Sequence, residues 1–101
     1  MTQIQATGDG AAVPERPRPR SGVETAYLSP AAVLYDDASG TVVHLNASAA
    51  AIWMTLDGRL DVGGIASELS QVFDVPPDTL RPDIDAALRD FARRNLIVEG
   101  A

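Results

Sequence analysis

Apolar and polar residues alternate in the first half of the chain, and this alternation predicts short strands. It begins at residues 23–28, is interrupted by Ser29-Pro30, and continues through residues 31–35 and 41–45. A period of two places successive side chains on opposite faces of a half-buried strand. Residues 36–40, Asp-Asp-Ala-Ser-Gly, are the types that turns require. We therefore expect three strands, the last two of which form a β-hairpin.

From Asn46 onward the apolar period changes from two to about 3.6, which predicts helices. The Asn46 side chain suits the cap of a first helix, and Gly58 suits its left-handed end. Asp61 can cap a second helix, and Pro76-Pro77 ends it. Because proline is tolerated only in the first turn of a helix, Pro82 marks the start of a third.

The end of the chain completes the layout. Asn95 takes the place of glycine at the C-terminal cap of the third helix, and the apolar residues 96–98 are expected to pack back on the core. Three strands followed by three helices indicate an α+β architecture. Two helices joined by the tight turn 57–60 beside a small sheet describe a winged-helix-like fold, with a three-stranded antiparallel β-sheet followed by three α-helices.

The first part of the chain has a different composition. Residues 1–21 are polar and rich in glycine and proline, and they end in alternating proline and arginine, which favours extended backbone. We expect a disordered Pro/Arg-containing tail at 1–21 and one domain at 22–101. A basic arm that touches an acidic partner is the functional alternative for the tail.

Composition narrows the possible chemistry. The chain has 101 residues, no cysteine, one histidine and a formal net charge of −6. The lack of cysteine excludes disulfides, thiolate metal sites and a cysteine nucleophile, and the sequence has no phosphate-binding glycine motif. We therefore expect no enzyme activity, no metal and no cofactor. Because no apolar run is long enough to cross a bilayer and no signal peptide is evident, we expect a cytoplasmic location and no membrane contact.

Three segments carry a resemblance to a known family. Tyr27-Leu28-Ser29-Pro30, the stretch from His44 to Trp53, and Leu56-Asp57-Gly58 resemble the PqqD-like family, whose domain is also called the RiPP recognition element. The Leu45-Asn46 entry to the first helix and the Leu-Asp-Gly exit are its most specific parts. The resemblance covers residues 22–98.

The resemblance implies a function. Proteins of this family bind the leader segment of a ribosomally synthesised precursor peptide and present it to a modifying enzyme, often a radical-SAM enzyme, in natural product biosynthesis. It therefore implies a noncatalytic peptide chaperone whose partners are a leader peptide and a modifying enzyme. No cofactor is implied for this chain itself.

A physical argument points to the same site. The third strand is expected at the edge of the sheet, where its unpaired backbone groups can accept a guest strand. This strand comprises Thr41, Val42, Val43, His44 and Leu45. The third helix is expected to supply a second wall, comprising Arg81, Ile84, Asp85 and Leu88. The sequence leaves open whether that flank or the opposite one, with Asp83, Ala87 and Arg94, lines the groove.

Two alternatives belong to other classes. A winged helix can bind DNA, but phosphate binding needs clustered positive charge, whereas residues 21–101 hold five arginines against twelve acidic residues. The recognition-helix candidate, residues 65–73, contains Glu68 and no arginine. We therefore expect no nucleic-acid partner. The second alternative is a subunit that docks on an enzyme without binding peptide. His44 and Trp53 are interpreted as a half-exposed strand residue and a core residue.

Overall fold

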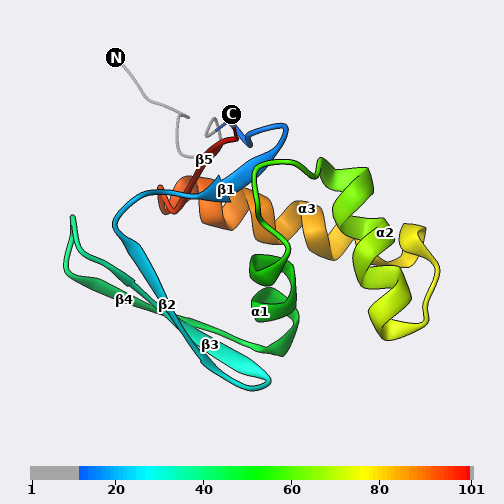
Figure 1. The fold of residues 1–101 in the computed structure, drawn as a ribbon, viewed down its shortest axis with the longest axis horizontal. Coiled ribbons are helices and arrows are strands. Elements are labelled where there is room, and N and C mark those ends of the chain that lie inside the picture. Colours follow the sequence, from blue (N-terminus) through cyan, green and yellow to red (C-terminus); the bar gives the residue numbers. More distant parts are fainter. Residues whose placement is uncertain (1–11, 101) are drawn as a thin grey trace, which may run out of the picture.

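A computed structural model of the chain describes residues 12–100, and Figure 1 shows its fold. The elements are β1 (Pro17–Pro19), β2 (Val23–Leu28), β3 (Ala31–Asp36), β4 (Thr41–Leu45), α1 (Ala47–Met54), α2 (Val62–Phe73), α3 (Pro77–Arg93) and β5 (Ile97–Glu99). The β2–β4 sheet and α2 lie at opposite ends of the molecule, with α1 between them and α3 running behind (Figure 1).

The three predicted strands form one antiparallel sheet in the order β2-β3-β4, with β3 in the centre. The predicted hairpin is present: Gly40 has a φ of 71° and donates its N–H to the Asp36 carbonyl at 2.8 Å. Ala32, Leu34 and Asp36 of β3 are buried, so alternate residues face the interior as the period of two requires. The expected α+β architecture is confirmed.

Helix α1 covers the inner face of this sheet. Its cap is the predicted one, because Asn46 Oδ1 accepts the Ala49 N–H at 2.9 Å. The Trp53 side chain, 2% exposed, donates its indole N–H to Thr25 Oγ1 of β2 at 2.9 Å. Its ring also meets the edge of Phe91 of α3, with centroids 5.1 Å apart and an interplanar angle of 81°. The interpretation of Trp53 as a core residue is therefore confirmed.

The helix boundaries differ from the prediction at α3. This helix begins at Pro77 and contains Pro82, whereas the sequence placed its start at Pro82. Pro77 occupies the first turn, where its missing N–H has no intrahelical partner to lose. Pro82 costs one helical hydrogen bond. The burial of Ile84, Leu88 and Phe91 farther along the same helix outweighs this cost.

The other helix ends follow the sequence more closely. Asp61 caps α2 by accepting the Gly64 N–H at 2.9 Å. Asn95 has a φ of 59°, so it takes the left-handed position expected after α3. The expected left-handed end of the first helix at Gly58 is wrong: α1 ends at Met54, and its cap Thr55 is in the right-handed region. Gly58, with a φ of 83°, lies in the loop beyond it. A Cβ at Gly58 would lie 3.2 Å from the Gly100 Cα, so this glycine also permits a close backbone contact.

Part of the predicted tail is structured. Pro17–Pro19 forms β1, which pairs antiparallel with β5. The loop after α1 joins this pair, since Gly58 donates its N–H to the Pro17 carbonyl at 3.0 Å. The structure therefore places ordered residues ahead of the domain boundary expected at residue 22. The expectation for residues 1–11 lies outside the described part of the chain.

The contacts of Trp53 predict how the fold responds to its loss. Trp53→Ala removes a buried ring that touches both the sheet and α3, so the free energy of unfolding should fall by about 3–5 kcal/mol. Thr25→Val keeps the ring but leaves its N–H without an acceptor, and should cost about 1–3 kcal/mol. Urea denaturation, monitored by backbone circular dichroism instead of tryptophan fluorescence, measures both losses of stability. Equal losses would contradict the assignment of ring packing as the larger contribution.

Candidate functional site

Strand β4 presents an open backbone edge. It pairs with β3 along one side, and within residues 12–100 no strand pairs with its other side. Unpaired N–H and C=O groups along such an edge form a template for a further strand. The sequence prediction that residues 41–45 lie at a sheet edge is therefore confirmed.

The side chains of β4 divide between the two faces of the sheet. Val43 and Leu45 pair with Leu34 and Ala32 and share their inner face. Leu45 is 5% exposed, so it offers backbone rather than side chain to a guest. Val42 and His44 face outward and are exposed, as expected for His44.

Two cavities lie near the two ends of β4. The first lies between β4 and the segment that follows α3, and the second lies between the start of α1 and α3. The cavity at the start of β4 has a volume of about 410 Å³, and its lining includes Thr41, Val43 and Arg94. The cavity at the end of β4 has a volume of about 320 Å³, and its lining includes Asn46, Asp83 and Ala87. We call these two cavities and the β4 edge between them the β4–α3 groove.

The groove uses one flank of α3. Its wall is formed by Asp83, Ala86, Ala87 and Arg94. This is the flank that the sequence named as the alternative, with Ala86 added. Ala86 gave no sequence signal, because a single exposed alanine on a helix carries no chemistry of its own.

The other flank of α3 lies elsewhere. Arg81, Asp85 and Leu88 line a different cavity of about 600 Å³, together with residues 13–15 and 61–63. Ile84 and Leu88 are 1% and 0% exposed, so their side chains belong to the core. The structure therefore does not bring the four expected helix residues together with β4. Their spacing placed them on one stripe, and packing turned that stripe toward α2 and the interior.

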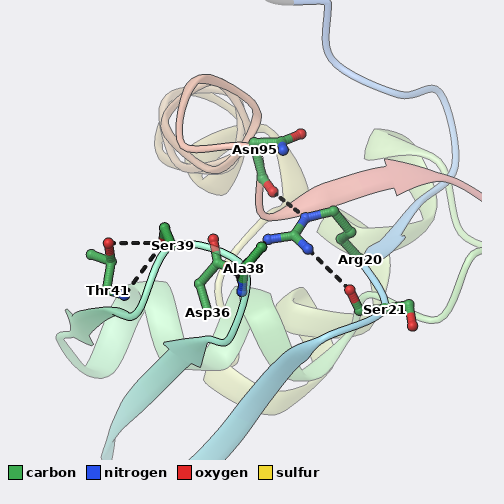
Figure 2. Close-up of polar contacts among 7 residues, drawn as sticks. All are labelled: Arg20, Ser21, Asp36, Ala38, Ser39, Thr41 and Asn95. Carbon is green, nitrogen blue, oxygen red and sulfur yellow. Dashed lines mark hydrogen bonds and ion pairs between the residues drawn. The ribbon is translucent and has the colours of Figure 1, made fainter.

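An ion pair that the sequence did not indicate closes one end of the groove (Figure 2). Arg20 Nη2 lies 2.6 Å from Asp36 Oδ1 at the end of β3, and Arg20 Nε donates to the Asn95 carbonyl at 2.7 Å. The Arg20 N–H also donates to the Leu96 carbonyl at 2.8 Å. One arginine thus joins the sheet to the residues that follow α3.

The environment of Asp36 keeps it ionised. The residue is 6% exposed. The hydrogen bond from Arg20 lowers the pKa of its carboxyl, against the effect of burial, and the Ala38 N–H adds a second hydrogen bond at 3.0 Å. A buried carboxylate requires such partners, because an unpaired buried charge is strongly unfavourable.

In the part of the chain that the structure describes, the sheet has a second open edge at β2, which is bordered differently. Near its end, Tyr27 and Leu28 are 50% and 62% exposed. A cavity of about 330 Å³ lies there, lined on the helix side by Met54 and Phe73. Partial burial raises the pKa of the Tyr27 hydroxyl. This apolar hollow lies beyond the end of β2, whereas the cavity at the start of β4 is lined by Thr41 and Val43 of that strand.

Residues 12–100 contain neither a metal-binding cluster nor a membrane-spanning helix. No three His, Asp or Glu side chains in this range lie close enough together to hold a metal ion. No helix in it is both long and apolar enough to cross a membrane.

Comparison with known proteins agrees with the fold. The family model described as coenzyme PQQ synthesis protein D (PqqD) matches residues 31–97. No curated protein matches the chain by sequence. Two similar solved structures are TbiB1 in complex with the TbiA(beta) leader peptide and lasso peptide synthetase B1 complexed with the leader peptide. The first has a TM-score of 0.71 and 24% identity, covering 83% of this chain and 98% of that one. The second has a TM-score of 0.69 and 24% identity, covering 82% and 98%.

The Arg20–Asp36 pair predicts a pH dependence of stability. Because the pKa of Asp36 is lowered in the folded state, its ionised carboxylate stabilises the fold. This stabilisation is complete at pH values above the ordinary pKa of aspartate and is lost as the pH falls below about 4. Asp36→Asn should lower the thermal midpoint at neutral pH and flatten its decline in acid. Thermal melts between pH 2 and 7 measure this.

The matched control for this prediction is Asp37→Asn. Asp37 neighbours Asp36 in the sequence and is exposed, so its replacement should leave the melting curve near that of the wild type. Asp57 also has a lowered pKa, chiefly because the Arg59 N–H donates to it, so some acid sensitivity should remain in Asp36→Asn. An acid decline identical in wild type and Asp36→Asn would contradict the assignment.

Proposed function

We propose that this chain, which belongs to the PqqD family, is a noncatalytic peptide chaperone that binds the leader segment of a ribosomally synthesised precursor peptide. The leader adds as a strand to the open edge of β4. The chaperone then presents the peptide to a modifying enzyme, and a radical-SAM enzyme is one such partner. We place this activity in the cytoplasm, where ribosomes make the precursor.

The observation that carries the proposal is the β4 edge, unpaired within residues 12–100, with a cavity near each end of the strand. Backbone hydrogen bonds to β4 supply affinity that tolerates different guest sequences. Alternate guest side chains point toward α3 and fill the two cavities, which supplies specificity. The two similar structures, each described as a complex with a leader peptide, support this assignment.

The proposed site comprises the backbone of residues 41–45 and one flank of α3. On the helix we assign the second wall to Asp83, Ala86, Ala87 and Arg94, because these residues line the groove. Arg81 and Asp85 are not part of the proposed site, since they line a cavity on the other flank. The side chains of Ile84 and Leu88 support the wall from the core.

A chaperone of this kind acts by raising local concentration. Binding the leader to a protein that also binds the enzyme turns the encounter of core peptide and active site into an intramolecular event. Effective concentrations for short flexible links reach the millimolar range. The protein itself then needs no reacting group.

The direct test is an NMR titration of the ¹⁵N-labelled chain with synthetic peptides that cover the short open reading frames beside its gene. Saturable shifts at residues 41–45 and at the groove flank of α3 are expected with one of them. Shifts at Tyr27 and Phe73 instead would assign binding to the hollow at the end of β2. A folded sample that responds to none of the peptides would contradict the proposal.

Proline substitutions test the strand addition itself. Backbone N–H groups of a strand point alternately to its two neighbours, so Val42→Pro and Val43→Pro differ in which side loses a donor. The variant that loses a free-edge donor should stay folded and bind peptide about tenfold more weakly, since both a hydrogen bond and the local geometry are lost. Fluorescence anisotropy with the responding peptide measures the affinity.

The other edge of the same sheet provides the matched control. Ala26→Pro in β2 should leave peptide affinity unchanged, because β2 and β4 are separated by β3. If both β4 variants unfold, Ala86→Trp serves instead, because it fills the cavity at the end of β4 from an exposed position. Folded β4 variants with wild-type affinity, or loss of binding in Ala26→Pro alone, would place the peptide elsewhere.

A further inference from the structure

The two ends of the β4–α3 groove carry side chains of opposite charge. Arg94 lines the cavity beside Thr41 and Val43, at the start of β4. Asp83 lines the cavity beside Asn46, just after the end of β4. Beside Asp83 the wall of α3 is small and apolar, with Ala86 and Ala87. A strand bound along β4 therefore passes a cation at one end and an anion at the other.

Arg94 is available to a guest carboxylate. Its Nε lies 3.0 Å from Asp90 Oδ2, and the two side chains are 51% and 40% exposed. Such an exposed pair contributes about 0–1 kcal/mol to stability, so Arg94 can readily exchange Asp90 for another anion. Among the described residues the side-chain contact of Arg94 runs through Nε, which leaves its two terminal nitrogens as donors.

The other arginine at this end is already committed. Arg20 lines the same cavity, but its guanidinium binds Asp36, the Ser21 carbonyl and the Asn95 carbonyl. Its side chain is 19% exposed. Arg20 thus holds the end of the groove in place, and Arg94 is the cation that a guest can reach.

Asp83 offers the complementary charge at the far end. It is exposed, and within residues 12–100 its carboxylate makes neither an ion pair nor a hydrogen bond. The neighbouring Asn46 side chain is occupied, because its Oδ1 accepts the Ala49 N–H. A carboxylate on this wall favours a guest lysine or arginine and disfavours a guest acid.

We propose that the groove selects a peptide segment with one acidic and one basic side chain, the acidic one at Arg94 and the basic one at Asp83. This inference rests on the proposed function and specifies the chemistry of the guest. Two charges of opposite sign also define the register of the guest on β4, which backbone hydrogen bonds alone leave free to slip.

The geometry sets the distance between the two charges. Arg94, the residue after α3, follows Asp83 by eleven positions, which is about 16 Å along the helix axis at 1.5 Å per residue. A strand covers that distance in about five residues. Because only alternate guest side chains face α3, the acidic and basic residues should be four or six positions apart, with an apolar residue between them on the same face.

The order of the two charges follows the direction of the guest. In a guest antiparallel to β4, the basic residue precedes the acidic one. In a parallel guest, the acidic residue comes first. Either order satisfies the charge pattern, so the order found reports the strand direction.

The net charge of the protein makes this selection more specific. With a formal charge of −6, the molecule as a whole repels an acidic peptide. An acidic guest residue is therefore tolerated best at the one place in the groove where an accessible arginine faces it. Basic guest residues gain from the general field as well as from Asp83.

The experiment is a selection from a displayed library of randomised 12-residue peptides on four proteins: wild type, Arg94→Glu, Asp83→Lys and Arg89→Glu. Arg89 is the matched control, because it lies on the opposite flank of α3 and lines the cavity with residues 13–15. The wild type should enrich an acidic and a basic residue four or six positions apart. Arg94→Glu should convert the acidic preference to a basic one, and Asp83→Lys should convert the basic preference to an acidic one.

Affinities of individual peptides complete the test. Arg94→Glu should weaken binding of an acid-bearing peptide about fivefold, and replacing that acid with arginine should restore it. Arg89→Glu should leave both the enriched pattern and the affinities unchanged. Arg94→Gln should remove the acidic preference without reversing it.

The results separate the two proposals. If no peptide is enriched on the folded wild type, or if enriched peptides bind the β4 proline variants as tightly as the wild type, the proposed function fails and this inference fails with it. If enriched peptides depend on β4 but show no paired charges, the charge selection is overturned and strand addition stands. A pattern that changes equally in Arg94→Glu and Arg89→Glu also overturns it, because that result reflects net charge alone.

Discussion

The indole of Trp53 connects the three parts of the fold that bound the groove. It belongs to α1, donates a hydrogen bond to Thr25 of β2, and packs edge-on against Phe91 of α3. The sheet and α3 are thereby set at a fixed separation by a rigid ring. Helix α1 packs on β3 and β4, and α3 packs mainly on α2. One cavity is left between the start of β4 and the segment after α3, and another between the start of α1 and α3.

The Arg20–Asp36 pair performs the same task at the end of the groove. Trp53 works through shape, whereas Arg20 works through its ion pair with Asp36 and its hydrogen bonds to the Asn95 and Ser21 carbonyls. Both hold the sheet to elements outside it, and neither uses a side chain of β4 for this purpose. The strand edge remains open because the fold is stabilised from β2, β3 and the helices. The exposed residues of the proposed site, such as Asp83 and Arg94, are not among these stabilising residues, so their variants can be separated from fold variants.

Under the function and the charge selection proposed above, specificity divides between the strand edge and the side chains beside it. Affinity comes from backbone groups that any peptide can satisfy, so it carries little sequence information. Discrimination then depends on a few side chains of α3. Small alanines provide room, and the opposite charges of Asp83 and Arg94 provide a register.

The sequence by itself determined the local elements, because strand alternation, the caps at Asn46 and Asp61 and the left-handed Asn95 depend on neighbouring residues. It also determined the edge position of residues 41–45, since a hairpin at the end of a meander leaves its last strand outermost. Tertiary structure alone decided which flank of α3 faces β4, that α3 continues through Pro82, and that Arg20 joins the fold by pairing with Asp36. Each of these outcomes depends on contacts between residues far apart in the chain, whose free energies outweigh the local preferences that the sequence displays.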